Sequence, residues 1–221
     1  MAGYYPLMLD LKGKLCVVIG GGSVAERKIR SLLDADADRV RAISPVVTEG
    51  IEGLAAGGSI VLERREYLEQ DLNNASLVFA ATDDPILNHS LAAAATAVGA
   101  LVNVADDSHQ GDFVTPAVIR RGDLVIALTT GGASPALASL IGRELQVRYG
   151  PDYAGKVVRL RELREQVLKR LSNPEERRAV LRLAAEELNT ASSAEPSDDG
   201  DEEQMEEWIR RLQAAADRRL T

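Results

Sequence analysis

The sequence predicts an α/β protein: a parallel, doubly wound sheet domain, then a hairpin-and-helix region, then a helical C-terminal region. Short apolar runs rich in β-branched residues alternate with helical patterns along the first 105 residues, which is typical of a parallel sheet. A glycine-rich turn directly follows the first of these runs. Beyond residue 150 the chain is rich in Arg, Glu and Leu at helical spacing. We therefore expect three segments, 1–112, 113–150 and 151–221.

Composition and charge exclude several classes of protein. The 221 residues are 45% hydrophobic and 27% charged, which excludes global disorder. With 34 acidic and 26 basic residues the net charge is -8, which argues against nucleic acid as a partner. The single cysteine, Cys16, cannot form an intramolecular disulfide, so the cytoplasm is the expected compartment. No apolar stretch approaches the roughly 20 residues of a membrane span, and no signal-peptide pattern opens the chain, so we expect neither membrane insertion nor export.

The first half of the sheet domain follows from alternating apolar and helical patterns. Its expected elements are strand 14–20, helix 24–33, strand 38–45, helix 51–56 and strand 59–63. The helix 24–33 carries its apolar residues at helical spacing, which places Glu26, Arg27, Lys28 and Arg30 on its outer face. Pro45 ends the second strand.

The second half of the domain repeats the pattern and then changes. Its expected elements are strand 77–82, helix 85–98, strand 101–105 and a hairpin of strands 113–119 and 123–129. Three helical patterns follow, from Ser134 to residue 145, over 154–171 and over 174–188. Residues 191–203 are acidic and poor in apolar residues, which predicts a linker before a last helix containing Trp208.

A glycine-rich turn at the end of the first strand predicts a dinucleotide site. Residues 20–25 (GGGSVA) fit G-x-G-x-x-[GA] between a predicted strand and a predicted helix, the context in which this motif is informative. Gly20 permits the tight turn, Gly22 lets a pyrophosphate approach the main chain, and Ala25 keeps the helix close to the sheet. The alternative is a turn that merely joins strand to helix.

The end of the second strand bears on the choice of cofactor. NAD-binding proteins usually carry Asp or Glu there to hold the adenosine ribose, whereas this chain has Ser44 and Pro45. Ser44 can still form a hydrogen bond to the ribose. Arg39 and Arg41 precede the strand end, but no arginine stands at the position that would bind a 2′-phosphate. We therefore expect NAD rather than NADP.

Carboxylates follow the fourth and fifth strands, at the sheet edge where ligands bind in such folds. Thr82, Asp83 and Asp84 follow the fourth strand, and we include Thr82 and Asp83 among the cofactor-binding candidates, with helix capping as the alternative. Asp106 and Asp107 follow the fifth strand, where a carboxylate could accept a proton near a nicotinamide ring. His109 has no second histidine or cysteine pair around it, so no resident metal site is expected.

A second glycine-rich turn precedes the helix at Ser134. Its residues 129–135 read TTGGASP, and their amides could bind an anion. Capping of the helix by Ser134, with Pro135 at its first position, is the simpler role and is compatible with anion binding.

Taken together, these motifs resemble the precorrin-2 dehydrogenase family, the dehydrogenase and ferrochelatase part of siroheme synthases. The segments that carry the resemblance occur in the family's order within about the first 150 residues: PL at 6–7, VIGGGSVAERK at 18–28, AATDD at 80–84, NVAD at 103–106, FVTPA at 113–117 and TGGASP at 130–135. The chain beyond them matches the family poorly.

The resemblance implies a Rossmann-like fold, oxidation of precorrin-2 by NAD to sirohydrochlorin, and in bifunctional members insertion of ferrous or cobaltous ion. Nucleotide contacts are implied for Ser23 and Val24 and for the Ser44-Pro45 pair. Asp106 matches the family's essential carboxylate and is implied to be the general base. The family also implies a homodimer, and an exposed hairpin edge favours such pairing.

A substrate with many carboxylates requires local positive charge in an acidic chain. Our candidates for substrate binding are the residues Arg120, Arg121, Thr130, Gly131, Gly132, Ser134 and Arg143. For the arginines, a solvent-exposed surface role is the alternative. Two other functions stay open: a nucleotide-sensing regulatory module without catalysis, which has little need of Asp106, and a tetrapyrrole carrier that does not need NAD.

Overall fold

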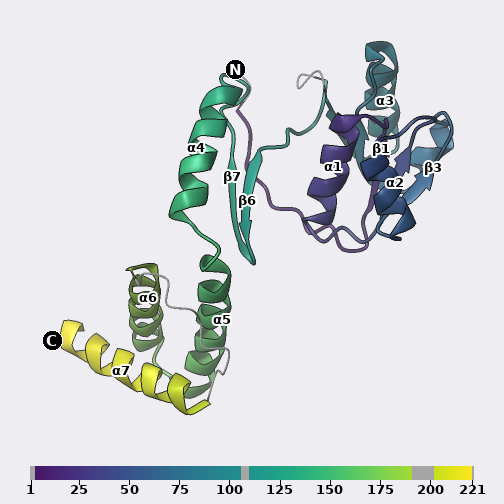
Figure 1. The fold of residues 1–221 in the computed structure, drawn as a ribbon. Helices are drawn as coiled ribbons and strands as arrows, with labels where there is room; N and C mark the ends of the chain where they lie inside the picture. Colours follow the sequence, from purple (N-terminus) through teal and green to yellow (C-terminus); the bar gives the residue numbers. More distant parts are fainter. Residues whose placement is uncertain (1–2, 106–109, 191–201, 221) are drawn as a thin grey trace. The chain divides into compact units, whose positions relative to one another are not determined.

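The computed structural model describes residues 3–105, 110–190 and 202–220 (Figure 1). The chain divides into two compact units, Met1–Thr115 and Pro116–Thr221. The first unit therefore extends beyond residue 112, and the residues on both sides of position 150 lie in one unit.

The first unit is built on a five-stranded parallel sheet, which confirms the expected α/β class. Its strands are β1 (Leu15–Ile19), β2 (Val40–Ile43), β3 (Val61–Glu63), β4 (Ala75–Ala80) and β5 (Leu101–Val104). They lie in the order β3-β2-β1-β4-β5 and every neighbouring pair is parallel. The chain leaves β1 toward one side and returns to β4 on the other, so the topological switch point lies between β1 and β4.

Helices cover both faces of this sheet. These are α1 (Ser23–Leu33), α2 (Glu49–Ala56), the 3₁₀ helix η1 (Glu69–Leu72) and α3 (Pro85–Ala97). One apolar cluster joins α1 and α2 to the sheet, and a second cluster on the opposite face joins η1 and α3 to it. Cys16 is fully buried in the first cluster, and burial, helped by nearby Asp38, raises the pKa of its thiol to about 11. This thiol is therefore a packing residue rather than a nucleophile.

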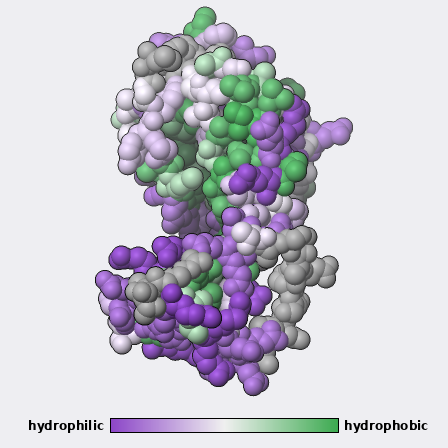
Figure 2. Space-filling view, turned by 90° about the vertical axis from the view of Figure 1, so that its left-hand side faces the viewer, coloured by the Kyte–Doolittle hydropathy of each residue, from purple (hydrophilic) through white to green (hydrophobic). Residues whose placement is uncertain are grey.

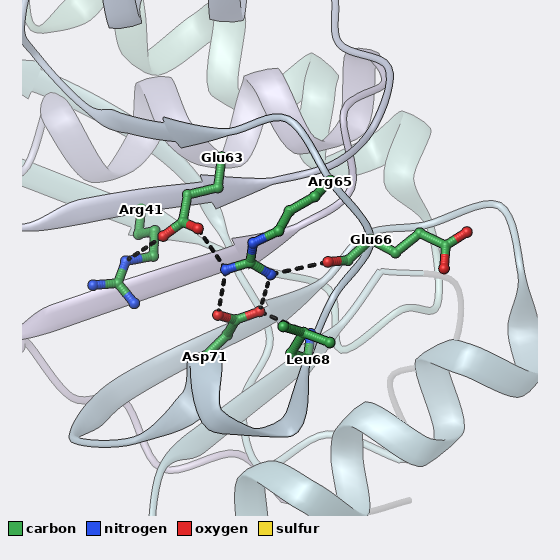
Figure 3. A network of polar contacts seen from close by, with 6 residues as sticks. All are labelled: Arg41, Glu63, Arg65, Glu66, Leu68 and Asp71. Atoms are coloured by element: carbon green, nitrogen blue, oxygen red, sulfur yellow. Dashed lines mark hydrogen bonds and ion pairs between the residues drawn. The ribbon is translucent and has the colours of Figure 1, made fainter.

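The connection after the edge strand β3 is held by a polar network (Figure 3). The Arg65 guanidinium donates to both carboxylate oxygens of Asp71 at 2.7 Å and to Glu63 at 2.5 Å. Asp71 is only 4% exposed and also accepts the Leu68 backbone N–H. These contacts, led by the Arg65 hydrogen bonds, hold the pKa of the Asp71 carboxyl below its usual range. The sequence patterns did not predict η1, which these contacts position.

The second unit begins with an antiparallel hairpin of β6 (Ala117–Arg121) and β7 (Leu124–Leu128). The helix α4 (Pro135–Arg148) packs against β6. The hairpin was expected from residue 113, and this start is wrong by four positions. Pro116 has no N–H to donate to a strand ladder, and Phe113 is instead bonded to the first unit through its carbonyl.

Three helices complete the second unit and confirm the expected helical C-terminal region. They are α5 (Tyr153–Arg170), α6 (Pro174–Thr190) and α7 (Glu202–Leu220). Their facing sides share one apolar cluster that includes Leu163, Val180 and Trp208, and the Arg159 guanidinium lies 4.8 Å from the Trp208 ring centroid. Most of the expected linker lies outside the described residues. Within the described part of the chain, no helix is long and apolar enough to cross a membrane.

Candidate dinucleotide site

The turn between β1 and α1 requires glycine at its first position. Gly20 has a φ of 126°, and a Cβ on it would lie 2.2 Å from the Ala81 carbonyl oxygen. The same Cβ would lie 3.2 Å from the Thr82 nitrogen. The structure therefore brings the glycine turn and Thr82 together at the carboxyl ends of β1 and β4.

Gly21 is a site residue that the sequence reasoning missed. A Cβ at this position would lie 1.9 Å from the Val46 carbonyl oxygen. The Gly21 carbonyl in turn accepts the Thr48 N–H at 3.0 Å. Gly21 thus lets the loop 44–48, which follows β2, lie directly on the turn. The only sequence signal for it was that the middle residue of the GGG run, at a motif position that is usually unrestricted, is also glycine.

Gly22 faces open space at the start of α1. It is the N-cap residue, it makes no side-chain cap hydrogen bond, and a Cβ on it would meet no atom within 4 Å. Ser23 and Val24 form the first turn of the helix, while Ala25 is fully buried against the sheet. An open glycine beside the free N–H groups of a helix start is a cradle for phosphate. The residues present therefore fit the pyrophosphate of a dinucleotide.

The loop after β2 contains an internal hydrogen bond. The Ser44 hydroxyl donates to the Val46 carbonyl at 2.7 Å, and Pro45 is exposed. The arginines that precede the strand end are both engaged: Arg39 donates to the Gly13 carbonyl at 3.3 Å, and Arg41 lies 3.7 Å from Glu63. Each of these arginines thus has a partner outside the loop 44–48.

The three polar residues that follow β4, Thr82, Asp83 and Asp84, have different surroundings in the structure. Asp84 is the N-cap of α3 and accepts the N–H groups of Ile86 and Leu87 at 2.8 and 3.2 Å. The Thr82 hydroxyl donates to Asn88 Oδ1 at 2.7 Å, and Asn88 is buried. Asp83 is exposed at the same edge. Capping thus accounts for Asp84, and Thr82 fixes the turn through Asn88.

The expected base Asp106, with Asp107 and His109, lies outside the described residues; what is described is the chain on either side. On β5, the Asn103 side-chain amide donates to the Phe113 carbonyl at 2.8 Å. The Asp112 N–H donates to the Val102 carbonyl at 2.8 Å, and its carboxylate accepts the Val102 N–H at 2.9 Å. Asn103 Oδ1 is buried without a hydrogen-bond partner among the described residues. Asp112 and Phe113, which follow Asp106 in the sequence, thus both bond to β5.

Lys28 was expected on the outer face of α1, and this expectation is wrong. The residue is 9% exposed, and its Nζ donates to the Thr115 hydroxyl at 2.5 Å and lies 5.9 Å from the Phe79 ring centroid. Phe79 in turn contacts Phe113 edge to face, with centroids 5.5 Å apart. Burial, with repulsion from Arg27, lowers the pKa of the Lys28 amine to about 8.

The remaining candidates lie in the second unit, on the turn before α4. Ser134 caps the helix by accepting the Leu137 N–H at 3.2 Å, and Pro135 occupies the first position, as capping predicts. The Thr130 hydroxyl accepts the Ser134 N–H and donates to its carbonyl, both at 3.1 Å. Gly131 and Gly132, with φ of 61° and 85°, are exposed between them.

The three candidate arginines differ in their surroundings. Arg121 donates to the carbonyls of Tyr149, Arg120 and Gln146 at 2.9, 2.8 and 3.4 Å, so its guanidinium secures the end of α4. The side chains of Arg120 on β6 and Arg143 on α4 are exposed. Among the described residues, no group of three or more His, Cys, Asp or Glu side chains is arranged to hold a metal ion.

Comparison with known proteins identifies the family. A family model described as "Putative NAD(P)-binding" matches residues 7–117. The chain belongs to this family. The siroheme synthase of Nitrosococcus oceani is 40% identical over 143 residues, covering 65% of this chain and 30% of its own length. That of Methylococcus capsulatus is 39% identical over 179 residues, covering 79% and 37%. The chain thus spans about a third of these relatives' length.

A solved structure is similar along the whole chain. SirC, precorrin-2 dehydrogenase, is 26% identical with a TM-score of 0.68, and the match covers 96% of this chain and 100% of SirC. The resemblance that the motifs predicted, to the precorrin-2 dehydrogenase part of siroheme synthases, is confirmed. The likeness also includes the helical C-terminal region, which the motifs left unmatched.

Proposed function

We propose that this family member is an NAD-dependent precorrin-2 dehydrogenase that produces sirohydrochlorin. The observation that carries the proposal is the likeness to SirC, which extends over the full length of that protein. The match to siroheme synthases supports a role in the same biosynthetic context. The cradle at Gly22 and the start of α1 is where the dinucleotide would bind.

The reaction removes two hydrogens from precorrin-2, one as hydride and one as a proton. Bound NAD supplies the acceptor for the hydride. Gly20, Gly22 and the first turn of α1 would hold the pyrophosphate, and Ser44 with Pro45 would line the adenosine end. Asp106 is proposed as the base that accepts the proton. Its position in the sequence, two residues after the end of β5, supports this role.

Substrate binding requires positive charge, because precorrin-2 carries many carboxylates. Arg120 and Arg143 are exposed and suit this role, and the turn containing Gly131 and Gly132 offers backbone amides. Arg121 donates to three backbone carbonyls, which favours a structural role over substrate binding for that residue.

The test is an anaerobic assay with NAD and enzymatically made precorrin-2, following NADH and sirohydrochlorin absorbance together. Asp106→Asn is expected to bind NAD and lose turnover. Asp36→Asn is the matched control, because Asp36 is exposed in the left-handed region that asparagine also tolerates. NAD binding without any turnover by the wild-type chain would refute the dehydrogenase and favour the nucleotide-sensing alternative. Full turnover by Asp106→Asn would refute the base.

We also propose ferrous ion insertion into sirohydrochlorin as a second activity, since the matching relatives are siroheme synthases. The metal would be a substrate here. As the metal enters, Asp106 would accept the two pyrrole N–H protons one after the other and release each to solvent. Purified protein should accelerate ferrous or cobaltous insertion above the uncatalysed rate, and Asp106→Asn should not. A wild-type rate equal to the uncatalysed one would remove this activity.

We further propose that the protein acts as a homodimer paired through its hairpin and α4. A two-stranded sheet has open edges, and α4 exposes Leu137, Leu140 and Val147, with exposed fractions of 49, 50 and 86%. Figure 2 shows hydrophobic residues gathered on the side of the molecule where α4 lies. Light scattering should give twice the chain mass for wild type and a monomer for Leu140→Glu. The cytoplasm is the compartment we propose, from the single cysteine.

A further inference from the structure

The loop after β2 is tied to a carboxylate that comes from a different element. The Thr48 hydroxyl donates to Glu26 Oε2 at 2.6 Å, and the Thr48 N–H donates to the Gly21 carbonyl at 3.0 Å. Glu26 belongs to α1, one helical turn after the phosphate cradle. The strand end itself carries Ser44 where NAD-binding folds usually place an acid. The structure therefore supplies a carboxylate to this loop from the helix.

The other oxygen of this carboxylate holds an arginine. Glu26 Oε1 accepts Arg30 Nε at 2.9 Å and Arg30 Nη2 at 2.7 Å. Arg30 and Thr48 therefore contact the same carboxylate, which connects Arg30 to the loop 44–48. The Nε and Nη2 groups of Arg30 both donate to this carboxylate. Arg39 and Arg41 are engaged as well, by the Gly13 carbonyl and by Glu63.

The neighbouring helix leaves space for the carboxylate. A Cβ on Gly50 would lie 2.1 Å from Glu26 Oε1. Glycine at this position of α2 therefore leaves the space that the Glu26 carboxylate occupies. The side chain of Glu26 is 22% exposed, which keeps its charge within reach of a ligand at the surface. The hydrogen bonds from Thr48 and Arg30 lower the pKa of Glu26, so it is ionised at neutral pH.

We propose that Glu26 makes this chain select NAD over NADP. The inference rests on the NAD binding proposed above and adds the residue that discriminates against NADP. The adenosine 2′ position lies beside the end of β2 in such folds. The negative charge of Glu26 repels a 2′-phosphate there, and Arg30 is already paired with Glu26 and does not offset this repulsion. The uncharged 2′-hydroxyl of NAD is not repelled.

The experiment measures dinucleotide binding without substrate, by fluorescence titration of the full-length chain with NADH and with NADPH. The wild type is expected to bind NADH more tightly. Glu26→Gln removes the charge and releases Arg30, so it should shift the ratio of the two Kd values toward NADPH by about fivefold or more, the factor for about 1 kcal/mol of exposed charge interaction. Glu69→Gln is the matched control, since it removes one exposed carboxylate from η1 on the opposite face of the sheet.

Two further variants separate charge from packing. Glu26→Asp keeps the charge and should keep most of the selectivity. Gly50→Ala displaces the carboxylate without changing Glu26 and should shift the ratio in the same direction as Glu26→Gln, which covers the case in which Glu26→Gln does not fold. The inference is overturned if Glu26→Gln changes the ratio by less than about twofold, if Glu69→Gln changes it equally, or if Glu26→Asp loses it completely.

These outcomes are independent of the dehydrogenase proposal. A wild-type chain that binds NADH but does not oxidise precorrin-2 refutes the proposed activity, while the Kd ratio still tests the role of Glu26. A wild-type chain that binds NADH and NADPH equally refutes the role of Glu26, while turnover still tests the proposed activity.

Discussion

Replacing Lys28 by methionine should stabilise the first unit at neutral pH. The amine is buried beside Phe79 with a neutral hydroxyl as its hydrogen-bond partner, and its pKa falls from 10.5 to about 8. A difference of this size corresponds to about 3 kcal/mol of cost for the charged form. Solvent and structural relaxation reduce it, so we expect about 1 to 2 kcal/mol. Methionine retains the length of the stem, and Thr115 is exposed enough for water to replace the lost contact.

The effect should depend on pH with a definite sign. The folded chain releases the Lys28 proton near pH 8, whereas the unfolded chain keeps it to about pH 10.5. Between these values the unfolded state binds more protons, so the stability of the wild type rises with pH in this window. Below pH 8 the cost is present in full. The advantage of Lys28→Met should therefore be largest at pH 7 and vanish near pH 10.5.

Amide hydrogen exchange of peptides from β1 and β4, followed in urea at several pH values, measures the free energy of unfolding of the first unit. Other groups titrate in the same window, so the relevant quantity is the difference between wild type and variant at each pH. Lys12→Met, which alters an exposed lysine, is the control and should show no such difference. A Lys28→Met chain that is less stable than wild type at pH 7, or whose advantage does not change with pH, would refute the reasoning.

Three other predictions concern the site and its frame. Gly22→Ala should cost less than about 1 kcal/mol of stability, because a Cβ there meets open space. It should weaken NADH binding about tenfold or more in a titration, because the methyl group enters the phosphate cradle. Unchanged binding would mean that the dinucleotide binds elsewhere. Asp71→Asn should lose about 2 kcal/mol at pH 7 in urea unfolding by breaking the bonds to Arg65. This loss should shrink as pH falls through the lowered pKa of Asp71, and a constant loss would contradict the ion pair. Asp84→Ala should lower stability by about 1 kcal/mol through its lost cap, with turnover retained; lost turnover at full stability would instead indicate a direct role.

The parallel sheet could be predicted because its signal is local. Each strand is a short apolar run between turn residues, and each helix shows its own period, so neighbouring residues are enough to recognise them. The motif at Gly20 was informative for the same reason, since its strand and helix are adjacent in the sequence. The order of the strands has no such local signal. It becomes visible only where strands distant in sequence, such as β1 and β4, pair in space.

The residues that were missed or misplaced are defined by contacts across the sequence. Gly21 is restricted by the carbonyl of Val46, and Lys28 is buried by Phe79 and Thr115. On a helical wheel Lys28 is simply a charged residue beside an apolar stripe. Its burial depends on Phe79 of β4 and on Thr115, which follows β5 in the sequence. The hairpin start failed similarly, because residues 113–115 have strand-like character but are bonded to the first unit.

The adenosine end illustrates why a fingerprint can miss the chemistry it is meant to detect. The fingerprint looks for an acid at the end of β2, because most such proteins carry the ribose-binding acid at this position of the sequence. Selection requires only that a carboxylate be near the 2′ position, whichever element carries it. Here Thr48 provides the connection, since it bonds to Gly21 through its amide and to Glu26 through its hydroxyl. A serine at the strand end is therefore no evidence for NADP in this chain, and relatives that keep both Glu26 and Thr48 should share its preference for NAD.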